Sequence, residues 1–366
     1  MTESGVTQYF AQWRGVSMGR REIVEGLVRP EHAGPSPALA AALADFDGQH
    51  YWDPGPDGHW LVLVREQDRK PERWWLHALL FAVTLITMMV AGSSLSGVLP
   101  ETWQLPSART LLTGLPFALP LAAILLAHES GHYVAARRYR VDSSPPFFLP
   151  FPPQLNVLGT MGAFIRLRSA IFDRRTLFDI GVAGPLAGAI IAIPVLAVGL
   201  AQSTVTSVLP PVPFARQFLL WGPHPFYLGD SLLLLAIRAF VAPHGVLQLS
   251  PMAVAGWAGL LITMLNLLPL AQLDGGHVTF AMFGRTQRWI ARATWLALLP
   301  LGYYFWPFWW VWAAIGLIVG RGRLAHPRVL APERPLSNGR RWLGAIAILL
   351  FVATFMPLPV HVPLFP

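Results

Sequence analysis

Long apolar runs without a formal charge constrain this chain more than any other feature of its sequence. Residues 74–92 are nineteen consecutive residues without Asp, Glu, Lys or Arg. A helix of about that length crosses a hydrocarbon core of about 30 Å. The whole chain is 54% hydrophobic and only 13% charged, with a mean hydropathy of +0.48. This composition is unusual for a soluble domain and favours a polytopic membrane protein.

Further apolar runs predict the rest of the architecture. We expect an all-α polytopic membrane protein of about six to seven transmembrane helices, with a small membrane-associated β-hairpin between the second and third. The count depends on residues 289–320, which form either one tilted helix or a hairpin bent at 303–310. Arginines flank both ends of this segment and favour the hairpin. The expected spans lie in residues 74–92, 110–137, 180–201, 251–270, 289–320 and 342–357.

Basic clusters separate these runs. Because positively charged loops are retained on the cytoplasmic side, we expect the N-terminus and the access to the site to be cytoplasmic. The net charge of +8 indicates such loops, so no nucleic-acid partner is expected. The first fifteen residues lack the apolar core of a cleavable signal peptide. The clusters beside the first two runs are Arg69, Lys70, Arg73, Arg137, Arg138 and Arg140.

Three regions are predicted along the chain. Residues 1–72 carry most of the acidic side chains and one strand-like stretch at 59–65, and are expected to form a small cytoplasmic region. Residues 73–290 form the membrane core, and residues 291–366 add C-terminal transmembrane helices. The chain has no cysteine, so His, Asp or Glu must hold any metal ion.

The segment between the second and third runs is not helical in character. Residues 144–153 are rich in proline and aromatic residues, which excludes a regular helix, and residues 157–167 are apolar and contain glycine, as in an extended strand. Non-helical backbone is tolerated near a membrane only where protein or a watery cavity satisfies its polar groups. We therefore expect a re-entrant or membrane-surface hairpin beside the site.

A metal-binding pattern ends the second apolar run. His128 and His132 are four residues apart, so they lie on one face of a helix and can both reach one cation. Glu129 can reach a water molecule on that cation without being a ligand, as general base of a hydrolase. The alternative is a polar helix face without a metal. Ionisable groups inside an apolar run are costly unless they serve a metal or a proton path, which favours the metal site.

A third ligand must come from elsewhere, because catalytic zinc takes three protein ligands and keeps one position open. Asp274 is the best candidate, since Pro269 interrupts the fourth run and the following Gly275-Gly276 permits a sharp turn. Two alternatives stay open: Asp274 caps a following helix, or His277 is the ligand. We prefer Asp274 because a carboxylate leaves the site less positive once zinc binds.

Four motifs occur in order and carry a family resemblance. They are H-E-x-x-H at 128–132, G-T-x-G-A at 159–163, A-G-P-x-x-G at 183–188 and N-x-x-P-x-x-x-L-D-G at 266–275. Over roughly residues 73–290 the chain resembles the site-2 protease family of intramembrane metalloproteases, particularly its bacterial and plastid branch. The motif before Asp274 is longer than the compact N-P-D-G of one branch, and no PDZ-like or CBS-like insertion is evident.

The resemblance implies one zinc ion per chain, held by His128, His132 and Asp274, with Glu129 as general base. It also implies that the partner in the reaction is a transmembrane protein substrate, cut near the cytoplasmic face of a lipid bilayer. We expect a multi-pass protein of a bacterial cytoplasmic membrane. The sequence predicts neither the substrate's identity nor the oligomeric state.

Two further roles are hypotheses from the residues themselves. Asn266 is either a donor to the oxyanion or substrate backbone or an amide that joins helices. The strand at 159–165 can bind an unwound substrate as an added strand, through Gly159, Thr160, Gly162 and Ala163.

A transporter or ion pathway would also use ionisable groups in broken helices and is the alternative function. A membrane zincin of another family is less favoured, because no downstream helix offers a glutamate ligand, and an inactive scaffold is disfavoured because the site is complete.

Overall fold

The computed structural model describes residues 5–18, 21–34, 36–55, 58–66, 72–97, 106–139, 141–168, 171, 173–206, 217–221, 224–241, 245–326 and 336–361. The chain divides into two compact units. The first comprises Met1–Glu72, Ala136–Ser144 and Arg166–Phe172, and the second comprises Arg73–Ala135, Pro145–Ile165 and Asp173–Pro366. Of the basic clusters expected to orient the chain, Arg69, Lys70 and Arg140 lie outside the described residues.

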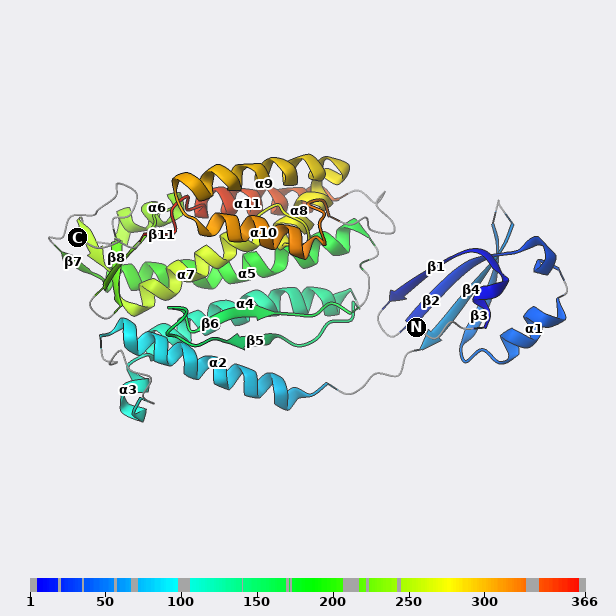
Figure 1. Ribbon diagram of the computed structural model, residues 1–366, viewed down its shortest axis with the longest axis horizontal. Helices are drawn as coiled ribbons and strands as arrows, with labels where there is room; N and C mark the ends of the chain where they lie inside the picture. The colour runs from blue at the N-terminus through cyan, green and yellow to red at the C-terminus, as the bar shows by residue number, and fades with distance from the viewer. Residues whose placement is uncertain are drawn as a thin grey trace. The chain divides into compact units, whose positions relative to one another are not determined.

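The first unit is built on a four-stranded antiparallel sheet of order β1-β2-β4-β3 (Figure 1). Alternate residues of β4 point to one face, where Leu61 and Leu63 are buried against Leu39 of α1. Ser36 caps α1 by accepting a hydrogen bond from the Leu39 amide. The strand-like stretch at 59–65 lies inside β4. The elements are β1 Phe10–Met18, β2 Arg21–Val28, α1 Pro37–Ala44, β3 Gln49–Gly55 and β4 Gly58–Glu66.

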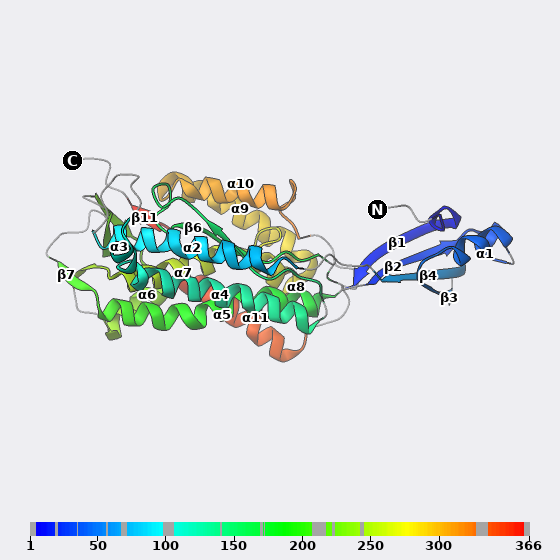
Figure 2. The same cartoon turned by 90° about the horizontal axis from the view of Figure 1, so that it is seen from below.

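The second unit consists mainly of packed helices (Figures 1 and 2). Small residues permit close approach: a Cβ on Gly199 or Gly256 of α5 and α7 would overlap backbone of the facing helix. Pro120 lies inside α4, whose last turn belongs to the first unit. The helices are α2 Trp74–Leu95, α3 Ala108–Leu112, α4 Leu115–Arg138, α5 Arg174–Ala201, α6 Leu232–Val241, α7 Pro251–Asn266, α8 Asp274–Phe283, α9 Gln287–Tyr304, α10 Phe308–Val319 and α11 Asn338–Thr354.

Two sheets complete the second unit. The first is an antiparallel pair of β5 (Phe147–Pro150) and β6 (Thr160–Phe164), and Figure 1 shows it beside α2 and α4. The second is a five-stranded sheet of order β11-β9-β8-β10-β7, in which β10 runs parallel to β8 and the other pairs are antiparallel. Its strands are β7 Thr204–Thr206, β8 Gln217–Trp221, β9 His224–Leu228, β10 Val246–Gln248 and β11 Val360–His361.

The expectation of an all-α protein with six to seven transmembrane helices is wrong. Among the described residues, only α2 and α5 are long and apolar enough to cross a membrane by length and composition. The fourth run forms a helix of 16 residues that begins at Pro251 and ends at Asn266. The segment expected to bend at 303–310 is divided at Pro307 into α9 and α10, and α10 has 12 residues. Prolines thus cut apolar runs into shorter helices, and residues 204–248 contribute four strands.

Candidate metal centre

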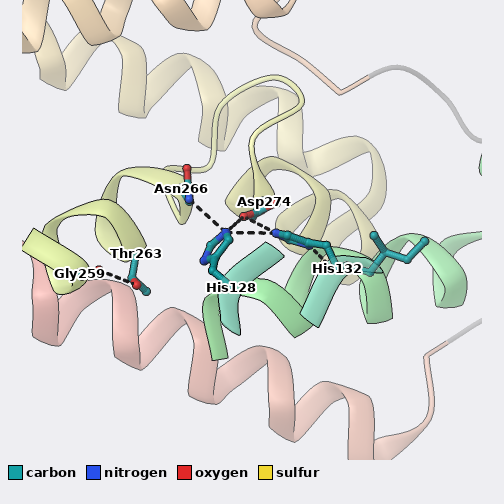
Figure 3. Close-up of polar contacts among 7 residues, drawn as sticks. His128, His132, Gly259, Thr263, Asn266 and Asp274 are labelled. Carbon is teal, nitrogen blue, oxygen red and sulfur yellow. Dashed lines mark hydrogen bonds and ion pairs between the residues drawn. The ribbon is translucent and has the colours of Figure 1, made fainter. Parts of the chain in front are cut away.

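The helix α4 presents three ionisable side chains to the interior of the second unit. His128, Glu129 and His132 are 3%, 6% and 7% exposed. The four-residue spacing brings the two imidazoles together, with His128 Nε2 and His132 Nε2 3.2 Å apart (Figure 3). The Nδ1 atom of His132 lies 2.7 Å from the carbonyl oxygen of Ile180 on α5. Nδ1 is therefore the protonated nitrogen, and Nε2 keeps its lone pair for a cation.

Glycines on α5 make the space for both imidazoles. A Cβ on Gly184 would overlap the ring of His132, and a Cβ on Gly188 would lie 3.3 Å from the Cβ and Nδ1 of His128. Gly131 of α4 packs on α5 in turn, since a Cβ there would lie 2.5 Å from the carbonyl oxygen of Ala183. The A-G-P-x-x-G motif predicts close packing of helices. The structure adds that the side chains packed against these glycines are the imidazoles of His128 and His132.

We expect Gly184→Ala to weaken zinc binding by more than about tenfold, because the added methyl group displaces His132 from its position. Zinc affinity of the purified variant, measured by competition with a chelator, tests this. Gly339→Ala is the matched control, since nothing lies within 4 Å of a Cβ at that position. Unchanged zinc affinity in Gly184→Ala would contradict this account of the glycine.

A turn between α7 and α8 brings the third ionisable group to the pair. Asn266 is the last residue of α7, and Asp274 is the first residue of α8. Asp274 Oδ2 lies 3.3 Å from His128 Nε2 and 3.2 Å from His132 Nε2. The N-cap position of α8 belongs to Leu273, and no side chain caps this helix. Asp274 therefore does not act as the cap that the alternative required, and its carboxylate faces both histidines.

These three side chains fit a zinc ion. Their ligand atoms all lie within 4.8 Å of one another, and the three pairwise separations are 3.2, 3.2 and 3.3 Å. A tetrahedral centre with bonds of about 2.0 Å places its ligand atoms about 3.3 Å apart. Two imidazoles and one carboxylate are also a common donor set of catalytic zinc.

The competing ligand lies elsewhere. His277 Nδ1 is 2.8 Å from Nε2 of His326, a partner that no local sequence spacing predicts. Asn266 does join the cluster, since its Nδ2 lies 3.2 Å from His128 Nε2 (Figure 3). The structure thus brings Asn266 and Asp274 to the histidine pair and turns His277 toward a different neighbour.

Glu129 connects the cluster to the hairpin. Its carboxylate accepts a hydrogen bond from the backbone of Ile165, the first residue after β6. Three of the four expected strand residues contact β5 within the hairpin, and Gly159 packs on α2. Thr160 Oγ1 donates to the carbonyl of Leu149 at 2.8 Å. Gly159 has a φ of 69° and packs so closely on Thr87 of α2 that a Cβ would overlap it. Gly162 and Ala163 pair with Leu149 and Phe148.

Comparisons with known proteins identify the family of the chain. The model of peptidase family M50 matches residues 116–301, which contain His128, His132 and Asp274. The chain is 32% identical to "Probable zinc metalloprotease EGY1, chloroplastic" of Oryza sativa subsp. japonica over 83% of this chain and 54% of that protein. It is 31% identical to the Arabidopsis thaliana protein of the same name, over 90% and 59%.

The chain thus spans just over half the length of these curated relatives. No solved structure matches. The family match covers more than half of this chain, and the four motifs that carried the resemblance all lie within the matched range. The predicted resemblance is therefore confirmed: the chain belongs to peptidase family M50, the site-2 protease family of zinc metalloproteases.

Proposed function

We propose that this protein hydrolyses peptide bonds within membrane-spanning helices of its substrates. The observation that carries the proposal is the cluster of His128, His132 and Asp274, spaced as zinc ligands and buried beside Glu129. Membership of a peptidase family favours hydrolysis over the transporter alternative. The two helices long and apolar enough to cross a membrane, α2 and α5, support a membrane setting. The bacterial cytoplasmic membrane and cytoplasmic access stay predictions, since the relatives above are plant proteins named as chloroplastic.

Glu129 is the proposed general base. His128, His132 and Asp274 would hold zinc, which polarises the scissile carbonyl and acidifies water when bound. The Glu129 carboxylate accepts a proton from the attacking water and passes it to the amine of the leaving peptide. Burial keeps bulk water away from this carboxylate, and the hydrogen bond from Ile165 fixes its position. Asn266, beside His128 Nε2, is placed to donate its amide hydrogen to the carbonyl oxygen as negative charge develops there.

The hairpin is the proposed binding site for the substrate backbone. A helical substrate hides its amides in internal hydrogen bonds and must be extended before it is cut. Among the described residues, β6 pairs only with β5, so its second edge can accept an added strand. A hydrogen bond joins the Glu129 carboxylate to Ile165, the first residue after β6, which supports a base at the end of this strand. A substrate paired along residues 159–165, with Gly159, Thr160, Gly162 and Ala163, would therefore reach the base.

We expect Met161→Pro to abolish cleavage and to leave zinc content unchanged. Met161 lies in β6 with 61% of its surface exposed, and proline there removes a backbone donor. Met161→Ala keeps that donor and is expected to lose far less activity. Cleavage rates of the two variants, with metal content from elemental analysis, give the comparison. Rapid cleavage by Met161→Pro would rule out the strand as the binding site.

The test of the proposed function is cleavage of a single-span substrate reconstituted with the protein in liposomes. Mass spectrometry of the products locates the cut bond. We expect it inside the apolar span, and we expect a chelator to stop the reaction until zinc is restored. Products cut only in the flanking soluble segments, or no zinc-dependent product, would contradict the proposal.

A further inference from the structure

The turn that carries Asp274 is an unusual piece of backbone. Ala271, three residues before the acid, has a φ of 43°, which is the left-handed region that side chains other than glycine rarely adopt. Such a conformation persists where neighbouring structure enforces it. The turn therefore depends on the segments packed against it.

One segment of the chain holds this turn by two hydrogen bonds. The Ala271 amide donates to the carbonyl of Leu324 at 2.9 Å, and Gln272 Nε2 donates to the carbonyl of Val319 at 3.4 Å. A Cβ on Gly320 would lie 3.1 Å from the Cβ of Ala271. We refer to residues 319–326 as the clasp. It begins at the last residue of α10 and lies beyond the residues that match the family model, which end at 301.

The clasp ends on a histidine that binds the helix of the third ligand. His326 Nε2 lies 2.8 Å from Nδ1 of His277, and the His326 ring stacks on Phe280 with centroids 4.7 Å apart. The His326 amide donates to Oε1 of Gln287 at 3.0 Å, and Gln287 is 1% exposed. The position of the His326 imidazole is therefore fixed by the backbone hydrogen bond to Gln287 and by the stacking of its ring on Phe280.

His277 is fixed on its other side by the helix that accommodates the histidine ligands. A Cβ on Gly181 of α5 would lie 2.7 Å from the Cβ of His277. His277 follows Asp274 by three residues on α8, so the two side chains lie on neighbouring parts of one helix surface. Rotation of α8 would move both together. The hydrogen bond to His326 therefore opposes the rotation that would carry Asp274 away from His128 and His132.

We propose that the clasp positions Asp274 for zinc, and that His326, acting through His277, is the positioning residue. This inference rests on the zinc ligands assigned under the proposed function. It predicts a role in metal affinity for a residue that contacts neither metal nor substrate.

The experiment measures zinc dissociation constants of the full-length protein by competition with a chelator, with no substrate present. His326→Phe keeps a ring to stack on Phe280 and removes Nε2. We expect zinc to bind about 10- to 100-fold more weakly, a loss of the size caused by removing a residue that orients a metal ligand. His326→Gln returns an amide near the position of Nε2 and is expected to recover most of the affinity. His277→Phe removes the same bond from the other side. Its combination with His326→Phe is expected to cost no more than either change alone.

His32→Phe is the matched control. His32 also stacks edge-on against an aromatic ring, that of Tyr9, and hydrogen-bonds to Ser36 Oγ at 3.0 Å, but it lies in the first unit. Wild-type affinity in His326→Phe would overturn the proposal. Equal losses in His326→Phe and His326→Gln would also overturn it, since a hydrogen-bonding group returned near the position of Nε2 would then recover nothing. The readout is zinc affinity, so a wild-type protein that binds zinc and cuts no substrate would contradict only the proposed function.

Discussion

Replacing Glu129 by glutamine is expected to lower the cleavage rate by about 10³-fold, the usual contribution of a positioned general base, while zinc binding stays at the wild-type level. Glutamine has nearly the shape of glutamate and can remain near Ile165, but it cannot accept the proton of the attacking water. The measurement is the initial rate of product formation from the reconstituted single-span substrate, with metal content determined on the same preparation.

Glu31→Gln is the control for this variant, because Glu31 is an exposed acid of the first unit. Undiminished cleavage by Glu129→Gln would remove Glu129 from the reaction. Loss of zinc together with activity would make it a ligand instead of a base. A transporter that used the same ionisable groups would instead show an altered flux and no proteolytic defect.

Asp274→Ala is expected to abolish both zinc binding and cleavage. The change leaves two imidazoles to hold the ion, where a catalytic zinc takes three protein ligands. The loss of affinity should exceed the roughly 10- to 100-fold that outer partners contribute. Zinc content after dialysis and the cleavage rate are the two measurements. Asp179→Ala is the control, since Asp179 is also a partly buried carboxylate but is paired with Arg340 at 2.7 Å. Full zinc content in Asp274→Ala would assign the third ligand elsewhere, with His277 the first residue to examine.

The metal cluster could be predicted from the sequence because the two histidines lie close together along the chain. A spacing of four residues fixes the relation of His128 and His132 on any helix. Asp274 was accessible because it follows an apolar run that Pro269 interrupts. Its distance to the histidines was not predictable, since it depends on the positive φ of Ala271 and on contacts with residues 319–326. His326 is 49 residues from its partner His277, and no periodicity connects the two.

The architecture was predicted less well than the site. Mean hydropathy detects apolar runs but does not say whether a run is one long helix or a shorter buried one, and α7 with 16 residues is largely buried. Strands of three residues such as β7 and β10 are too short for a period-two pattern. The bend near Pro307 was predicted because arginines flank both ends of residues 289–320 and favour a hairpin over one tilted helix. Features that depend on neighbouring residues could therefore be predicted from the sequence, whereas the pairing of distant segments could not.

The five-stranded sheet has a consequence for the order of events during synthesis. Its edge strand β11 pairs with β9 through Val360 and Leu228, whose positions in the sequence differ by 132. The Gly229 amide donates to the carbonyl of Pro359, and Trp309 Nε1 donates to the carbonyl of Pro357. Such contacts close a long loop and form late in folding. Until residues 357–361 have been synthesised, the edge of β9 stays open and can pair with other chains. A nascent chain is thus vulnerable at this edge until β11 has paired with β9.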